Sequence, residues 1–294
     1  MIRYISYLKS DTKTLEDVEI HCAISDNDYQ VIKKYTAEVQ RYFKFKALLK
    51  MVQKNYTELG EFIDGSNSSI HSQPGEDVFY ESNRLLLNFL SITRTFLDHH
   101  ETILKRVYGA DSEAVSNFKS ECKRVYDDYF GYRFFYKLRN YSQHCGMPFG
   151  TYEHFMSRDK ATGEKKPVVH ILFERDTLLK SFNSWGNPVK GELELMPEKF
   201  LIHDAIKDLM ISIKQIHESV LTNVKEDVLG AIFNFIKLLK SLGANGQPIL
   251  VNFKSIKEKE LRKIHSISAL ETEKIPEILF TYNVKEEEIL AWWK

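Results

Sequence analysis

The chain has 294 residues, 43% of them hydrophobic and 28% charged, which is typical of a folded globular protein and argues against a disordered one. Its 41 basic and 41 acidic residues cancel, so the chain lacks the net positive charge that attracts nucleic acid without sequence preference. Three cysteines without a CxxC pair, and no apolar run as long as a membrane span, predict a cytoplasmic protein that does not associate with membranes.

The N-terminal half of the chain is predicted to be helical. Apolar residues recur at helical spacing over residues 29–63, which indicates one long helix or two shorter ones, and turn-forming residues follow as far as Pro74. A second helix is predicted over residues 76–108. A third helix begins after Asp111 or Ser112 and runs to Cys145, so that these two helices form an antiparallel hairpin.

The C-terminal half mixes strands with helices. Two apolar runs flank a charged turn and predict a β-hairpin, and a short strand is expected at residues 192–195. Helices are predicted over residues 198–222 and 225–242, then a strand at 248–253 and further helices from Ser255 and near Lys285.

These elements predict a mainly α-helical fold, a bundle of long antiparallel helices with a small inserted β-hairpin. Its expected domains are an N-terminal helical segment (1–74), a helical bundle (75–223) with the hairpin near 151–175, and a C-terminal helical extension (224–294).

The last part of the helix that ends at Cys145 has an unusual polar face. On a helical wheel of about 100° per residue, an apolar stripe is expected to face the core and is formed by Phe130, Phe134, Leu138, Tyr141 and Cys145. The opposite side lacks the glutamates and lysines of an ordinary solvated face and carries Tyr129, Tyr132, Arg133, Tyr136, Arg139, Asn140, Gln143 and His144. Such a face suits a partner surface or a polar site.

Arg139 and His144 are the residue types that RNA cleavage without a metal requires. A histidine can accept and donate a proton near neutral pH, and an arginine offers a planar fork to a phosphate. Attack by a ribose 2′-hydroxyl on the adjacent phosphorus needs one group that transfers protons and another that stabilises the negative charge on the phosphate. The two side chains diverge by about 140° on an ideal helix, so the long arginine stem or a symmetric pair of helices must bring them together. Asn140 lies one turn before His144 on the same face.

This Arg-polar-x-x-x-His pattern near the end of a helix resembles the signature of the HEPN superfamily (higher eukaryotes and prokaryotes nucleotide-binding). These helical domains include toxin and phage-defence ribonucleases. The resemblance covers residues 139–144 and extends, by helical architecture alone, to about residues 76–222. Many family members carry a tyrosine shortly after the histidine, whereas Cys145, Gly146 and Met147 follow here.

The resemblance implies a homodimeric endoribonuclease that needs no metal or other cofactor and leaves a 2′,3′-cyclic phosphate and a 5′-hydroxyl. Arg139 would bind the phosphate, His144 would act as acid and base, and Asn140 would orient them in a site shared by two subunits. Neighbouring residues on the same helix, Tyr136, Gln143 and Arg133, are expected to contact the RNA.

Other interpretations of the same residues stay open. The face could belong to a non-catalytic scaffold that binds a protein partner or a second copy of itself, or to a nucleotide-binding regulator. His144 could cap its own helix, and Cys145 is expected to be a packing residue. Arg94 and His99 form a second match to the spacing and could line the cleft beside Arg139.

Overall fold

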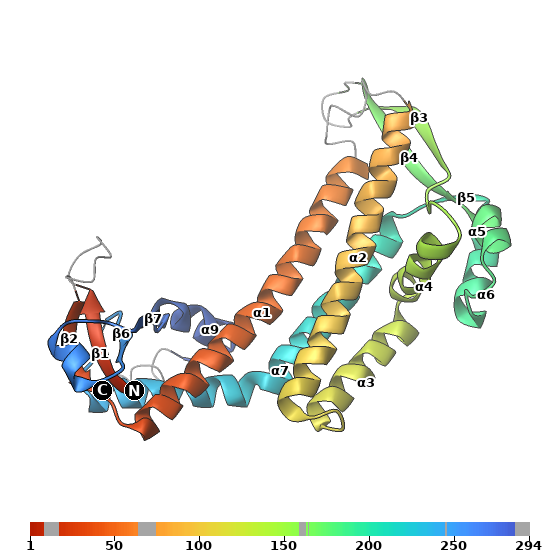
Figure 1. Ribbon diagram of the computed structural model, residues 1–294. Coiled ribbons are helices and arrows are strands. Elements are labelled where there is room, and N and C mark those ends of the chain that lie inside the picture. The colour runs from red at the N-terminus through yellow and green to blue at the C-terminus, as the bar shows by residue number, and fades with distance from the viewer. Residues whose placement is uncertain (9–17, 64–74, 159–162, 164, 245, 286–294) are drawn as a thin grey trace. The chain divides into compact units, whose positions relative to one another are not determined.

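The computed structural model describes residues 1–8, 18–63, 75–158, 163, 165–244 and 246–285 (Figure 1). Over this part of the chain the fold is mainly α-helical, with two small antiparallel sheets. The residues form two compact units, one of residues 1–44 and 224–294, the other of residues 45–223. Two long helices, α1 (Asp26–Ile63) and α7 (His203–Ser241), supply residues to both units. The expected domains divide the chain at residues 74 and 223, whereas the first of these units combines segments from both ends of the chain.

The first unit contains a four-stranded antiparallel sheet of order β2-β1-β6-β7. Its strands are β1 (Ile2–Leu8), β2 (Val18–Ala23), β6 (Ile249–Phe253) and β7 (Ser266–Ala269). Residues from both ends of the chain build its apolar cluster, since Val18 packs with Ile249, Val251 and Phe253. The strand expected at 248–253 is therefore confirmed as β6, whereas β1 and β2 occupy a segment that had been expected to be helical.

Helices complete this unit. The Tyr35 ring of α1 stacks on Phe235 of α7 with ring centroids 3.8 Å apart, and both side chains are buried. The shorter elements are α8 (Ile256–Glu260), the 3₁₀ turn η3 (Thr272–Lys274) and α9 (Ile275–Thr281). The helix predicted from Ser255 is confirmed as α8. The segment after Lys285, near which another helix was expected, lies outside the described residues.

The second unit is built on α2 (Gly75–Tyr108), which packs against α3 (Glu113–Asp128) and α4 (Phe130–His144). The apolar positions of α2 fall on one face, and Leu86, Phe89 and Phe96 are fully buried there. Gly109, at φ +94°, ends α2, and the Ser112 side chain accepts the Val115 N–H at 3.4 Å to begin α3. The turn and the cap at Ser112 agree with the prediction.

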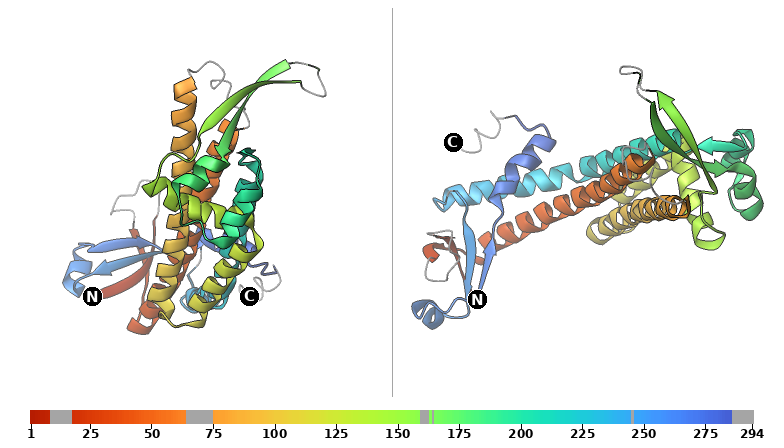
Figure 2. Two further views of the ribbon diagram at one scale, coloured as in Figure 1. Left: turned by 90° about the vertical axis from the view of Figure 1, so that its right-hand side faces the viewer. Right: turned by 90° about the horizontal axis from the view of Figure 1, so that it is seen from above.

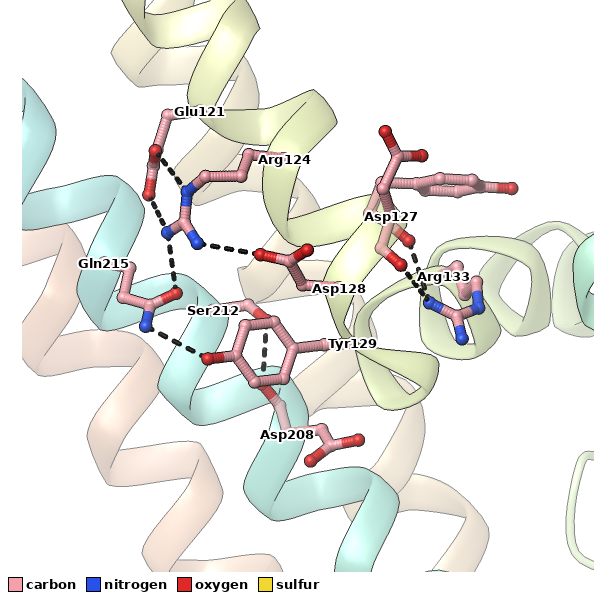
Figure 3. A network of polar contacts seen from close by, with 10 residues as sticks. Glu121, Arg124, Asp127, Asp128, Tyr129, Arg133, Asp208, Ser212 and Gln215 are labelled. Atoms are coloured by element: carbon pink, nitrogen blue, oxygen red, sulfur yellow. Dashed lines mark hydrogen bonds and ion pairs between the residues drawn. The ribbon is translucent and has the colours of Figure 1, made fainter.

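One helix had been expected from Asp111 or Ser112 to Cys145, and this was wrong because the chain breaks at Tyr129. Tyr129 has an extended backbone (φ −117°, ψ 117°) and separates α3 from α4. Polar contacts hold the break, as Figure 3 shows: Arg124 binds Glu121 and Asp128 on α3 and reaches Gln215 on α7. Gln215 in turn donates to the Tyr129 hydroxyl at 3.1 Å.

The predicted β-hairpin is confirmed as β3 (Thr151–Arg158) and β4 (Lys165–Glu174), which extend away from the helices of this unit (Figure 2). A third strand, β5 (Lys199–Leu201), pairs with β4 in a sheet of order β3-β4-β5. Two short helices, α5 (Arg175–Ser181) and α6 (Asn187–Leu195), connect β4 to β5.

Two further expectations in this region were wrong. Residues 192–195 belong to α6 and not to a strand, because Pro188 opens a helix that buries Val189 and Leu193 one turn apart. Residues 198–242 do not form two helices. The chain forms β5 and then the uninterrupted α7, along which Val220, Val224 and Val228 continue one buried stripe.

Candidate functional site

Helix α4 carries the Arg139–His144 segment, and both of its ends are held by neighbouring elements. At its start, Gly131 lies so close to α7 that a Cβ atom there would be 2.0 Å from the Ala205 carbonyl oxygen, and its N–H donates to Asp208 at 3.2 Å. Beyond its end, the Phe149 N–H donates to the buried Asn83 side chain of α2 at 3.1 Å. These contacts fix the position of the helix within its unit.

An aromatic cluster supports the buried side of α4. Phe134 stacks parallel to Trp185 with centroids 5.8 Å apart, and Tyr141 also stacks on Trp185, at 5.9 Å. Phe134, Leu138 and Tyr141 are buried as the wheel predicts, but Cys145 is exposed and the expectation that it packs in the core was wrong. The apolar stripe therefore ends at Tyr141, and the last turn of α4 extends beyond the packed core.

A cavity of about 180 Å³ opens beside the other side of α4. Helix α2 supplies Leu90, Thr93, Arg94 and Leu97, α4 supplies Tyr132, Phe135, Tyr136, Arg139 and Asn140, and α7 supplies Leu209. All of these residues belong to one compact unit. Two residues predicted for the site, Arg139 and Asn140, thus line the same cavity, and Tyr136 lies there with them.

Arg139 and Asn140 bring unused hydrogen-bonding groups to this cavity. Within the described residues, neither the Arg139 guanidinium nor the Asn140 carboxamide has a hydrogen bond or an ion pair, although both side chains are partly buried. Arg94, across the cavity, is bound to Asp98 at 2.8 Å, so that pair has no net charge. The positive charge of Arg139 is therefore uncompensated, and the cavity suits an anionic ligand.

His144 lies at the exposed end of the same helix, one turn beyond Asn140. Its imidazole makes no hydrogen bond or ion pair with any described residue, and the last α4 contacts are made by other groups. The Cys145 N–H donates to the Tyr141 carbonyl at 2.8 Å, and the Ser142 hydroxyl donates to Leu138 at 2.8 Å. His144 is not among the residues that line the cavity, and its side chain is exposed.

The Arg133 guanidinium is bound to other groups of the protein. Its Nε donates to Glu192 of α6 at 2.8 Å and its Nη2 binds the same carboxylate. Its Nη1 donates to the carbonyls of Tyr126 and Asp127, at 3.0 and 3.2 Å (Figure 3). With these groups engaged, Arg133 joins α4 to α3 and α6.

The polar face that the wheel placed on α4 is only partly open. Tyr132 is buried against α3, close to Cys122, and burial raises the pKa of the Cys122 thiol to about 12. Tyr136, Gln143 and His144 are exposed. Neighbouring helices thus cover the first half of this face, and the second half remains available.

Arg94, which belongs to the second match to the Arg–His spacing, lines the same cavity as Arg139. Its guanidinium lies 5.8 Å from the centre of the Tyr136 ring. His99, its motif partner, is exposed and does not line the cavity. The apolar lining, Leu90, Leu97 and Leu209, was not predicted as part of a site, because one sequence does not reveal which core residues border a cavity.

Within the described residues, no group of three or more His, Cys, Asp or Glu side chains is placed to hold a metal ion. Among the helices described there, none combines the length and the apolar character needed to cross a bilayer. Comparisons of the chain with family models, with curated proteins and with solved structures gave no match.

Proposed function

We propose that the protein is a HEPN-like endoribonuclease that cleaves RNA without a metal, through attack of a ribose 2′-hydroxyl on the adjacent phosphorus. One observation carries the proposal. An unpaired guanidinium and an unpaired carboxamide, those of Arg139 and Asn140, line a cavity one turn before an exposed histidine with no partner among the described residues. Residues 45–223 would then correspond to the bundle of antiparallel helices on which this family builds its site.

In this reaction the 2′-oxygen forms a bond to phosphorus and the bond from phosphorus to the 5′-oxygen breaks. A base takes the proton of the 2′-hydroxyl, and an acid gives a proton to the leaving 5′-oxygen. His144 serves these proton transfers, and Arg139 holds the negative charge on the non-bridging phosphate oxygens. Asn140, on the same face as His144, orients the phosphodiester between them. The products are a 2′,3′-cyclic phosphate and a 5′-hydroxyl.

A second copy of the chain completes the site in this proposal. Arg139 lies at the cavity whereas His144 lies beyond it at the helix end, so the two side chains of one chain are turned toward different places. Two α4 helices related by a two-fold axis would place His144 of each copy near Arg139 of the other. The exposed last turn of α4 leaves room for this arrangement.

The test is cleavage of single-stranded RNA by the purified full-length protein in the presence of a chelator. His144→Ala is expected to lower the rate by about 10²- to 10⁴-fold, the usual contribution of a general acid or base. Arg139→Ala is expected to lower it by about 10²- to 10³-fold, as for loss of one group that stabilises charge in the transition state. Mass spectrometry should find the 2′,3′-cyclic phosphate.

Matched variants separate this site from the second match to the motif. His99→Ala removes another exposed histidine of the same unit and is expected to leave the rate within about two-fold, because surface substitutions away from a site are close to neutral. Cleavage that survives both His144→Ala and Arg139→Ala would exclude this site. A chelator-sensitive activity, or loss of activity in His99→Ala alone, would also contradict the proposal.

A further inference from the structure

The cavity beside α4 has features that phosphate binding alone does not require. Arg139 and Asn140 are its available polar groups, while much of its lining is aromatic or aliphatic, including Phe135, Leu97 and Leu209. The hydroxyl of Thr93 is already donated to the Phe89 carbonyl at 2.8 Å. The cavity therefore offers apolar and aromatic surface directly next to an unpaired cation.

Tyr136 is held in place as one wall of this cavity. The edge of its ring meets Tyr126 of α3 at 6.2 Å and 88°, and Arg94 lies over the ring at 5.8 Å. Asp98 fixes Arg94 through two contacts, of 2.8 and 2.9 Å. Tyr136 is nevertheless 42% exposed. A fixed and accessible aromatic ring is what a planar ligand needs for stacking.

The size of the cavity limits what can enter. Pockets for drug-sized ligands measure about 300–1,000 Å³, and the cavity of about 180 Å³ is smaller than these. An engineered protein cavity of about 150 Å³ holds one benzene ring. The space is thus close in size to what a single six-membered ring with its substituents fills.

We propose that this cavity is the base-binding subsite of the RNA site and takes one pyrimidine, unstacked from its neighbours, of a single-stranded RNA. The inference rests on the proposed function, since Arg139, which lines the cavity, would hold the phosphate of the nucleotide whose base lies inside. A base inside a duplex cannot leave its stack without a cost of a few kcal/mol, so the substrate class is single-stranded RNA cleaved next to a pyrimidine.

The test measures binding, so that it does not depend on cleavage. The probes are fluorescent 2′-O-methyl oligonucleotides that carry a single uracil, cytosine, adenine or guanine in an otherwise abasic backbone, and fluorescence anisotropy gives their affinity for the full-length protein. The two pyrimidine probes are expected to bind about ten-fold more tightly than the purine probes or the fully abasic one. A factor of this size is the usual contribution of one stacked base to binding affinity.

Tyr136→Ala is expected to abolish this preference and to leave the affinity for the abasic probe unchanged. Tyr80→Ala removes an exposed tyrosine of α2 that does not line the cavity, and this variant should keep the preference for pyrimidine probes. Leu97→Phe fills the cavity while Tyr136 stays, and should abolish the preference as well. Equal affinity for all the probes, or a preference that survives Tyr136→Ala, would overturn the inference.

The two proposals can fail separately. If the pyrimidine probes bind selectively but unmodified RNA is not cleaved, the base subsite stands and the nuclease proposal fails. If RNA is cleaved through Arg139 and His144 without any preference among the probes, the nuclease proposal stands and the pyrimidine subsite is excluded.

Discussion

Two histidines, His100 and His217, are buried among apolar rings in the unit formed by residues 45–223. His100 Nδ1 donates to the Phe96 carbonyl at 2.7 Å, so its Nε2 is unprotonated, and that atom has no partner among the described residues. Phe45 stacks on the His100 ring at 4.8 Å, and His217 meets the same ring edge-on at 5.9 Å. Neither imidazole has an acidic partner there, so a positive charge on either ring would not be balanced.

This environment makes the folded protein sensitive to acid. Burial lowers the pKa of His100 from 6.5 to about 3, assisted by His217 and His99, and burial with the charge of Lys46 lowers that of His217 to about 4. Each folded-state pKa lies below the unfolded value, so the unfolded chain takes up protons first and stability is lost as the pH falls below 6.5. Between pH 7.5 and pH 5 each histidine is expected to cost roughly 2 kcal/mol of unfolding free energy.

Urea unfolding at pH 7.5 and at pH 5 measures this loss. Replacement of both imidazoles, in His100→Phe with His217→Phe, should reduce the difference between the two pH values by most of the roughly 4 kcal/mol expected for the pair. His99→Ala, on the same helix but exposed, should leave the difference nearly as in the wild type. An undiminished loss of stability in the double variant would show that other groups cause it.

At the scale of elements, the approach of α4 to α7 determines where the candidate site lies. The closest contact is at Gly131, where a Cβ would also come within 2.6 Å of the Asp208 Cβ. Because the Ala205 carbonyl belongs to the α7 backbone, it cannot move aside as a flexible side chain could. A larger residue at position 131 must therefore push the first turn of α4 away from α7.

Gly131→Ala is accordingly expected to lower the unfolding free energy by roughly 1–3 kcal/mol, the usual cost of overpacking. Because α4 also carries Arg139 and His144, RNA cleavage should fall more than the folded fraction does. Gly60→Ala is a matched control in α1, where a Cβ would meet no atom within 4 Å, and should raise stability by roughly 0.5–1 kcal/mol. Denaturation curves for both variants check this, and a neutral Gly131→Ala would contradict the close packing.

An element could be predicted where residues close to it in the sequence determine its bounds, and not where contacts with distant segments do. The bounds of α2 and the β3–β4 hairpin follow from apolar periodicity and turn residues nearby in the sequence. The break at Tyr129 has no proline, and the only local sign is Gly131, two residues further on. Contacts from α7 hold the break, and these are not visible in the sequence around it. Strand β1 pairs with β6, more than 240 residues away, and such non-local pairing is not visible in a single sequence.

The candidate site, too, could be predicted from the sequence only in part. Arg139, Asn140 and His144 stand out because their types and spacing match the chemistry, and Arg139 and Asn140 do line a common cavity. Arg133 has the same residue type, but Glu192, 59 positions away, occupies its guanidinium. Only tertiary contacts distinguish an arginine bound to a carboxylate from one that is free to bind a ligand.

At the scale of the whole molecule, the charges balance at 41 basic and 41 acidic residues, so nothing in the net charge draws RNA to the protein. Affinity for a phosphodiester has to come from a local arrangement of charges. A single unpaired Arg139 would bind a phosphodiester only weakly. In a dimer with a two-fold axis, the guanidinium groups and imidazoles of both copies could contact the same RNA strand, which would raise the affinity.

A shared site of this kind makes a specific prediction for mixtures of inactive variants. Arg139→Ala still supplies His144, and His144→Ala still supplies Arg139, so a dimer with one chain of each restores one of its two sites. After subunit exchange half of the dimers are mixed, and roughly a quarter of the wild-type cleavage rate is expected to return. The rate of RNA cleavage is measured before and after the two proteins are incubated together at high concentration.

The double variant, Arg139→Ala with His144→Ala in one chain, is the control, because its mixture with either single variant leaves no chain pair with a complete site. If the mixture of single variants stays inactive while sedimentation shows that subunits exchange, both groups must act within one chain. That outcome would require the side chains of Arg139 and His144 to converge on one phosphate from the same helix, which their separation of about 140° opposes. Recovery of activity would instead place the cleaved bond between two copies of α4.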